Sequence, residues 1–184
     1  MKNIALFLTL LIPFFYLLIE LFILQSVSDP IKYIYTITGV SATVILFFTI
    51  CISMIKKYLN LMKYRRMIGL FGFFYALLHF LNFYILDAEL DFSFVISESL
   101  DKPFIYLGMI AFFILVFMAL TSTKKLFAKY NKYHKFVYLA LVLITIHFIM
   151  AQKSLSILQL VYISIILLIS YCKLLQQIIR KNRV

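Results

Sequence analysis

The chain has 184 residues, of which 65% are hydrophobic and 14% charged, with a formal net charge of +11 and no Trp. This composition lies far outside the range of soluble globular domains. The sequence therefore predicts an integral membrane protein. Its positive charge is interpreted as cationic helix flanks that touch anionic lipid, rather than as a nucleic-acid interface.

Apolar stretches that could span a bilayer occur six times. A spanning helix needs about 20 apolar residues, and such runs lie near 4–24, 37–55, 67–86, 103–121, 136–151 and 157–172. The first run is too long for a signal peptide and lacks its cleavage site, so we interpret it as the first helix. The expected fold class is all-α, a six-helix membrane bundle in which residues 1–184 form one domain.

The basic residues predict how the chain is oriented. Fifteen of the 18 Lys and Arg residues lie at the N-terminus, in alternate loops or in the C-terminal tail. These are Lys2, Lys56, Lys57, Lys63, Arg65, Arg66, Lys124, Lys125, Lys129, Lys132, Lys135, Lys173, Arg180, Lys181 and Arg183. By the positive-inside rule both termini are expected in the cytoplasm. Every acidic residue except Glu20 then falls on the external side.

Several kinds of site are excluded. The longest loop, of about 16 residues from Asp87 to Lys102, is too short to fold as a second domain. All four glycines lie in spanning segments, so no glycine-rich loop can hold a nucleotide phosphate. Cys51 and Cys172 form no CxxC pair and are interpreted as packing residues.

Two of the three histidines, His79 and His147, lie inside apolar runs. His79 is 12 residues beyond Met67, where its run begins, and His147 is 12 residues beyond Lys135. An ionisable side chain at such depth is costly to desolvate, which indicates a function. The third and fifth helices run in the same direction, so both imidazoles reach one level, about 18 Å from the cytoplasmic edge. We expect a haem iron bound between them.

Small residues precede His79 on its helix. Gly69, Gly72 and Ala76 share one helical face with His79, and a flat macrocycle could lie against Gly72 and Ala76. The alternative is ordinary close packing of membrane helices through small residues. A zinc site is less favoured because zinc takes three or four ligands, and no acidic residue or cysteine lies at this depth.

His134 is a candidate ligand for a second haem. It precedes His147 by 13 residues, a rise of about 20 Å, but the two rings do not share a face of an ideal helix. On the third helix the corresponding positions are Arg65 and Arg66. Arginine is a poor iron ligand, although it can hold a haem propionate.

Two other functions remain open. A free-standing reductase of ferric ion or another small acceptor would use the same haem without a protein partner. A haem-free transporter or scaffold would bury its histidines by packing, and Glu20, near the outer end of the first helix, is the residue that favours it most.

The motifs together resemble one family. They are Asp29-Pro30-Ile31-Lys32 with Thr38-Gly39, Arg65-Arg66-Met67-Ile68-Gly69-Leu70 leading to His79, Lys102-Pro103-Phe104 leading to Thr121-Ser122-Thr123, and His134-Lys135-Phe136 leading to Ile146-His147-Phe148. This set is similar to the MsrQ (formerly YedZ) family, the haem-binding subunit of the periplasmic protein-methionine-sulfoxide reductase system. That family belongs to the ferric-reductase-like transmembrane group.

The resemblance implies a redox subunit of the bacterial inner membrane with no catalytic residues of its own. Electrons would come from quinone or a cytoplasmic flavin reductase and pass through b-type haem to a periplasmic molybdopterin reductase, MsrP. His79 and His147 would be the haem ligands, with His134 as a second or alternative site. FMN is also implied, but none of the residues is assigned to it. We expect the partner to dock near Asp87, Glu89 and Asp91.

Overall fold

The computed structural model describes residues 2–55 and 61–152, and within the next stretch positions 157, 159–161, 163–165, 167–168 and 171. Within these residues the chain is all-α, as predicted. Six of the 16 positions of the sixth expected helix, 157–172, among them Cys172, and all of the C-terminal tail lie outside the described residues. The expected six-helix count and the cytoplasmic placement of both termini therefore stay predictions.

Within the described residues, five helices are long and apolar enough to cross a membrane. They span Asn3–Leu24, Pro30–Ser53, Met62–Asp87, Pro103–Leu120 and Lys124–Ala151. The first span consists of α1 (Lys2–Leu18) and the π-helix η1 (Ile19–Leu24), and the second is α2 (Pro30–Ile55). The third consists of the 3-10 helix η2 (Met62–Tyr64), α3 (Arg65–Asn82) and the π-helix η3 (Phe83–Asp87), and the fourth is α5 (Pro103–Leu120). The fifth consists of α6 (Lys124–Tyr130), the 3-10 helix η4 (Asn131–Lys135) and α7 (Phe136–Ala151). The predicted spans 4–24, 67–86, 103–121 and 136–151 lie within a few residues of α1 with η1, α3 with η3, α5 and α7, whereas α2 begins earlier than predicted.

Capping residues explain where the structure departs from the hydropathy pattern. The Asp29 carboxylate accepts a hydrogen bond from the Lys32 amide (3.0 Å), so α2 begins at Pro30 rather than near 37. The loop between Asp87 and Lys102 contains a further helix, α4 (Phe92–Asp101), capped by Asp91. The Thr123 side chain caps α6 in the same way.

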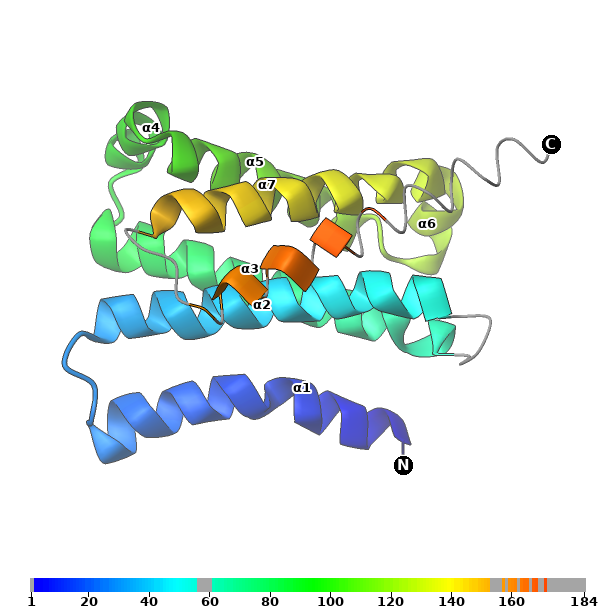
Figure 1. Ribbon diagram of the computed structural model, residues 1–184, viewed down its shortest axis with the longest axis horizontal. Helices are drawn as coiled ribbons and strands as arrows, with labels where there is room; N and C mark the ends of the chain where they lie inside the picture. The colour runs from blue at the N-terminus through cyan, green and yellow to red at the C-terminus, as the bar shows by residue number, and fades with distance from the viewer. Residues whose placement is uncertain are drawn as a thin grey trace.

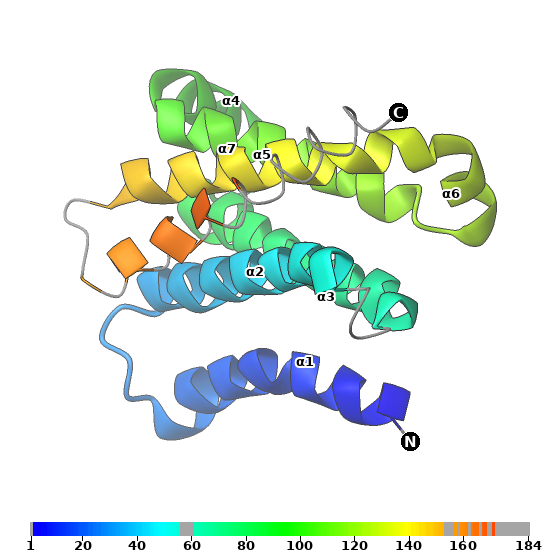
Figure 2. The ribbon, with the colours of Figure 1, turned by 45° about the vertical axis from the view of Figure 1, so that its right-hand side comes forward.

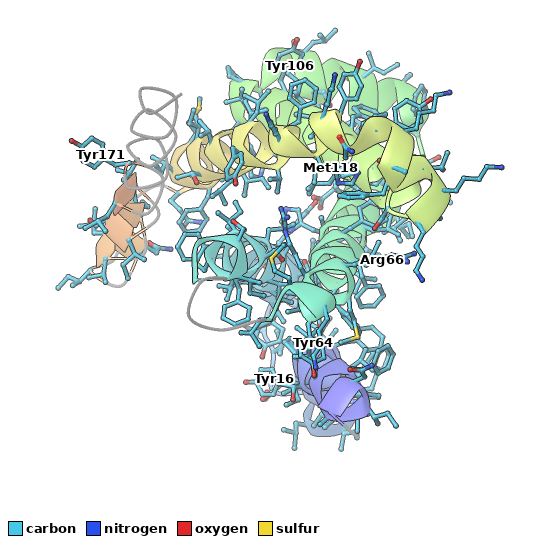
Figure 3. The ribbon with its side chains drawn as sticks, turned by 90° about the vertical axis from the view of Figure 1, so that its right-hand side faces the viewer. Tyr16, Tyr64, Arg66, Tyr106, Met118 and Tyr171 are labelled. Atoms are coloured by element: carbon cyan, nitrogen blue, oxygen red, sulfur yellow. The ribbon has the colours of Figure 1, made fainter. Side chains whose placement is uncertain are left out.

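Four of the helices form a ring. Helix α2 packs along α3 and α5 packs along α7, while smaller contacts of α3 with α5 and of α2 with α7 close the ring. Figure 3, viewed along the helices, shows these four around a common centre. Helices α3 and α7 thus occupy opposite corners of the ring. Successive helices alternate in direction (Figure 1), so α3 and α7 run the same way.

Helix α1 lies outside the ring along α2 and α3 (Figures 1 and 2). Pro13 lies in its interior and cannot donate the usual helical hydrogen bond. Next to it, the fully buried Tyr75 of α3 donates its hydroxyl to the Leu10 carbonyl (2.7 Å) and accepts from the Phe14 amide (3.2 Å). Leu10 and Phe14 are the partners of one α-helical hydrogen bond, so Tyr75 inserts into α1 at the proline.

Charge is divided between the two ends of the bundle. All seven acidic residues lie at the end where η1, η3 and α4 meet: Glu20, Asp29, Asp87, Glu89, Asp91, Glu98 and Asp101. Among the described side chains, most basic residues lie at the opposite end: Lys63, Arg65, Arg66, Lys124, Lys125, Lys129, Lys132 and Lys135. We call these the acidic end and the basic end.

Candidate functional site

The structure brings two of the three histidines together inside the ring. His79 lies three residues before the end of α3, and His147 lies four residues before the end of α7. Their ring centroids are 6.2 Å apart and their planes are 83° to each other. This confirms that both imidazoles lie at one level. The pair is near the acidic end, since four residues of α-helix correspond to a rise of about 6 Å.

Backbone carbonyls fix the protonation of both rings. Nδ1 of His147 is 2.6 Å from the Phe104 carbonyl oxygen, and Nδ1 of His79 is 3.2 Å from the Tyr35 carbonyl oxygen. A carbonyl can only accept, so each Nδ1 carries the proton and donates it. In a neutral imidazole Nε2 then keeps a free lone pair. Metal-binding histidines in proteins are held in the same way.

Other polar groups support His79 from α2. The Thr38 hydroxyl is fully buried and lies 3.3 Å from Nδ1 of His79. The Tyr35 ring contacts the imidazole edge-on, with centroids 5.1 Å apart. Its hydroxyl donates to the Asp87 carboxylate. A chain of contacts therefore runs from His79 through Tyr35 to the acidic end.

A glycine of a neighbouring helix lies against each imidazole. A Cβ added at Gly39 of α2 would lie 3.0 Å from Cε1 of His79, and one at Gly108 of α5 would lie 2.8 Å from Nδ1 of His147. Any other residue at either position would push on the ring. Sequence reasoning missed this role of both glycines; the available signal was a glycine inside an apolar helix, where it costs stability unless something needs the space.

The glycines that precede His79 on its own helix lie against α2. A Cβ at Gly72 would meet the Leu46 side chain of α2 at 2.8 Å, and one at Gly69 would meet Thr49 at 3.7 Å. Gly72 therefore lets α2 and α3 approach closely, as in the close-packing alternative, and its place against a cofactor stays a prediction.

Ala76 does face the centre of the ring. It packs, one turn before His79, against the buried side chains of Leu46, Leu115 and Ala140. Leu46, Leu115 and Ala140 form an apolar layer about two helical turns from the level of the imidazoles, toward the basic end. Both imidazoles are largely buried, with a minor part of each residue exposed.

His134 and the two arginines lie apart from this pair. Nε2 of His134 is 3.1 Å from the Thr121 hydroxyl, and its ring packs against Phe127 with centroids 4.7 Å apart. Arg65 is close enough to interact electrostatically with His134. Arg66 is exposed and lines a groove between α1 and α3. All three residues are at the basic end, so the structure separates them from His79 and His147.

The donor set of the central pair suits a haem. Two imidazoles that share one metal ion through bonds of about 2 Å place their centroids roughly 6 Å apart, close to the separation found here. Among the described residues, no group of three or more His, Cys, Asp or Glu side chains could hold a metal ion, whereas structural zinc takes four ligands. A haem supplies the remaining four ligands itself, so the pair fits this group.

Comparison with known families agrees with this geometry. The model of the ferric reductase like transmembrane component matches residues 55–151, which is more than half of the chain and includes all three histidines. The chain belongs to this family. Together with the five apolar helices of its described part, this membership identifies a multi-pass membrane protein. No solved structure matches.

Individual relatives give a narrower comparison than the family as a whole. The chain is 37% identical over 136 residues to the protein-methionine-sulfoxide reductase heme-binding subunits MsrQ of Brucella ovis and Brucella suis biovar 1. It is 36% identical to that of Brucella melitensis biotype 2. The matches cover 71% of this chain and 62% of each of the first two relatives. The chain therefore spans less than two thirds of the length of the relatives it matches.

Proposed function

We propose that this chain is a haem-binding membrane subunit that carries electrons to a protein-methionine-sulfoxide reductase. The observation that carries the proposal is the pair of imidazoles, His79 and His147, with centroids 6.2 Å apart and with each Nδ1 held by a carbonyl. The Brucella relatives are heme-binding subunits of this type. His79 and His147 would hold one b-type haem, and that haem would supply reversible one-electron chemistry.

The protein's own part is to position and insulate that group. The carbonyls of Tyr35 and Phe104 keep the imidazoles in one tautomer. The layer of Leu46, Leu115 and Ala140 separates the pair from the basic end. His79 and His147 would together hold the iron, and the group would supply electron transfer rather than binding of oxygen or substrate.

The direction of transfer follows from charge. With the basic end in the cytoplasm, the histidine pair lies near the external surface. A periplasmic acceptor would dock at the acidic end, with MsrP as the partner that the family resemblance implies. The donor would be quinone or a cytoplasmic flavin reductase at the opposite end. FMN is proposed on the resemblance alone, and His134 remains the candidate for a second haem.

The family description favours one alternative, a reductase of ferric ion that acts without a protein partner. Both functions need the same haem, so the choice depends on the acceptor. The haem-loaded chain would be assayed with two acceptors, an external ferric chelate and a periplasmic methionine-sulfoxide reductase. Equal rates of reduction for the two would support this alternative.

Absorption spectroscopy of the purified full-length chain tests the haem assignment. The dithionite-reduced protein should show the spectrum of six-coordinate b-type haem. His79→Ala and His147→Ala should each abolish it, whereas His134→Ala, the matched control, should retain the haem of the central pair. Unchanged haem content in both of the first two variants would contradict the assignment.

A further inference from the structure

A groove of about 550 Å³ lies between α1 and the first half of α3, outside the four-helix ring. Its apolar wall is formed by Phe7 and Leu11 of α1 and by Met67, Leu70 and Phe74 of α3. Figure 3 shows α1 set apart from the ring, with Tyr64 between α1 and α3. The groove is thus separate from the histidine pair.

Two cations close the groove at the basic end. Lys63 and Arg66 line it, and both are exposed. All seven acidic residues of the chain are described and lie at the opposite end, so no Asp or Glu side chain neutralises these two charges. The Lys63 ammonium instead lies over the Tyr64 ring, 4.9 Å from its centroid. The groove therefore offers an anion two charged donors next to an apolar wall.

The length of the groove matches one leaflet of a bilayer. Phe74 is 11 residues beyond Lys63, which is a helical rise of about 16 Å. A hydrocarbon core is about 30 Å thick, so one leaflet is roughly half of that. The cations then lie at headgroup level while the apolar wall extends to the middle of the membrane.

We propose that this groove binds one anionic phospholipid. Its phosphate contacts Arg66 and Lys63, because arginine and lysine are the usual protein donors to phosphate. One acyl chain lies along Met67, Leu70 and Phe74 and fills the seam beside α1. The lipid would add to the few contacts that attach α1 to the ring. This proposal does not depend on the haem assignment.

Native mass spectrometry of the detergent-purified full chain, titrated with phosphatidylglycerol, tests this site. The wild type should retain one lipid, and Lys63→Gln with Arg66→Gln should weaken its binding about thirtyfold, since each basic side chain contributes roughly fivefold. Lys124→Gln with Lys125→Gln is the matched control, because it removes the same charge at the same end but outside the groove. Circular dichroism and gel-filtration elution check that each variant folds.

A second variant keeps the proposal testable if the double substitution fails to fold. Leu11→Trp fills the groove and leaves both cations in place, so it should also remove the bound lipid. Equal loss of lipid in the Lys63/Arg66 and Lys124/Lys125 pairs would overturn the proposal. So would equal binding of phosphatidylcholine, or a quinone that co-purifies with the wild type and is released by Leu11→Trp.

Discussion

Gly108 of α5 lies directly against the ring of His147, such that an added Cβ would be 2.8 Å from Nδ1. That nitrogen also donates to the Phe104 carbonyl at 2.6 Å. The position of Gly108 therefore sets both the place of the imidazole and its hydrogen bond. A methyl group there must displace one or the other.

Gly108→Ala is accordingly expected to weaken haem binding by about tenfold to a hundredfold, the range found when a group that orients a metal ligand is altered. The measurement is a haem titration of the purified chain, followed by absorption spectroscopy. Gly69→Ala is the matched control, since its Cβ would make only an ordinary contact, 3.7 Å from Thr49. Equal affinity of the two variants would show that the ring tolerates the methyl group.

Gly39→Ala is expected to act in the same direction with a smaller effect. Its Cβ would lie 3.0 Å from Cε1 and 3.1 Å from Nδ1 of His79, so a shift of a few tenths of an ångström would relieve the contact. The haem should remain bound, but its midpoint potential should change. Potentiometric titration measures this potential. A haem loss greater than that of Gly108→Ala would contradict this order.

The level of the histidine pair could be predicted from the sequence because depth depends on spacing alone. His79 lies 13 residues beyond Arg66 and His147 lies 12 residues beyond Lys135, which predicts nearly the same height for both rings, and their centroids are 6.2 Å apart. Rotation about the helix axis depends instead on the neighbouring helices. For that reason the contacts of Gly39 and Gly108 with the imidazoles were missed.

The interfacial helices α4 and α6 were missed for a different reason. They are short and carry charged residues, so a search for apolar runs does not detect them. Their caps were nevertheless present in the sequence: Asp91 accepts from the amides of Ser93 and Phe94, and Thr123 accepts from the amide of Leu126. Reading such caps inside hydrophilic loops predicts these helices.

Tyr75→Phe is expected to loosen α1 without changing the histidine pair. The substitution removes the hydroxyl that bridges the Leu10 carbonyl and the Phe14 amide, at a cost of about 1 kcal/mol. Thermal unfolding in detergent measures it. Tyr106→Phe is the control, because Tyr106 is half-exposed and its hydroxyl has no hydrogen bond within the described part of the chain. Equal unfolding temperatures for the two variants would remove the role of Tyr75.

Substitution of acidic residues at the acidic end tests where the electron acceptor docks. The structure shows which of these residues can be replaced without disturbing the fold. Asp87 accepts from Tyr35, Asp91 caps α4, and Asp29 caps α2, so substitutions there would disturb the fold. Glu89 and Asp101 are exposed and make no polar contact within the described residues. They are the acids whose charge can be removed without other effects.

Glu89→Gln with Asp101→Asn should slow reduction of a docked periplasmic reductase roughly threefold to tenfold at low ionic strength, because charge complementarity mainly raises the rate of encounter. The difference should vanish at high salt, where surface charges are screened, and the haem spectrum should not change. Stopped-flow reduction of the acceptor over a series of salt concentrations measures the effect. Lys124→Gln with Lys125→Gln, at the basic end, should leave the rate unaltered. If this second pair slows the reaction and the first does not, the acceptor docks at the basic end and the proposed direction of electron flow is reversed.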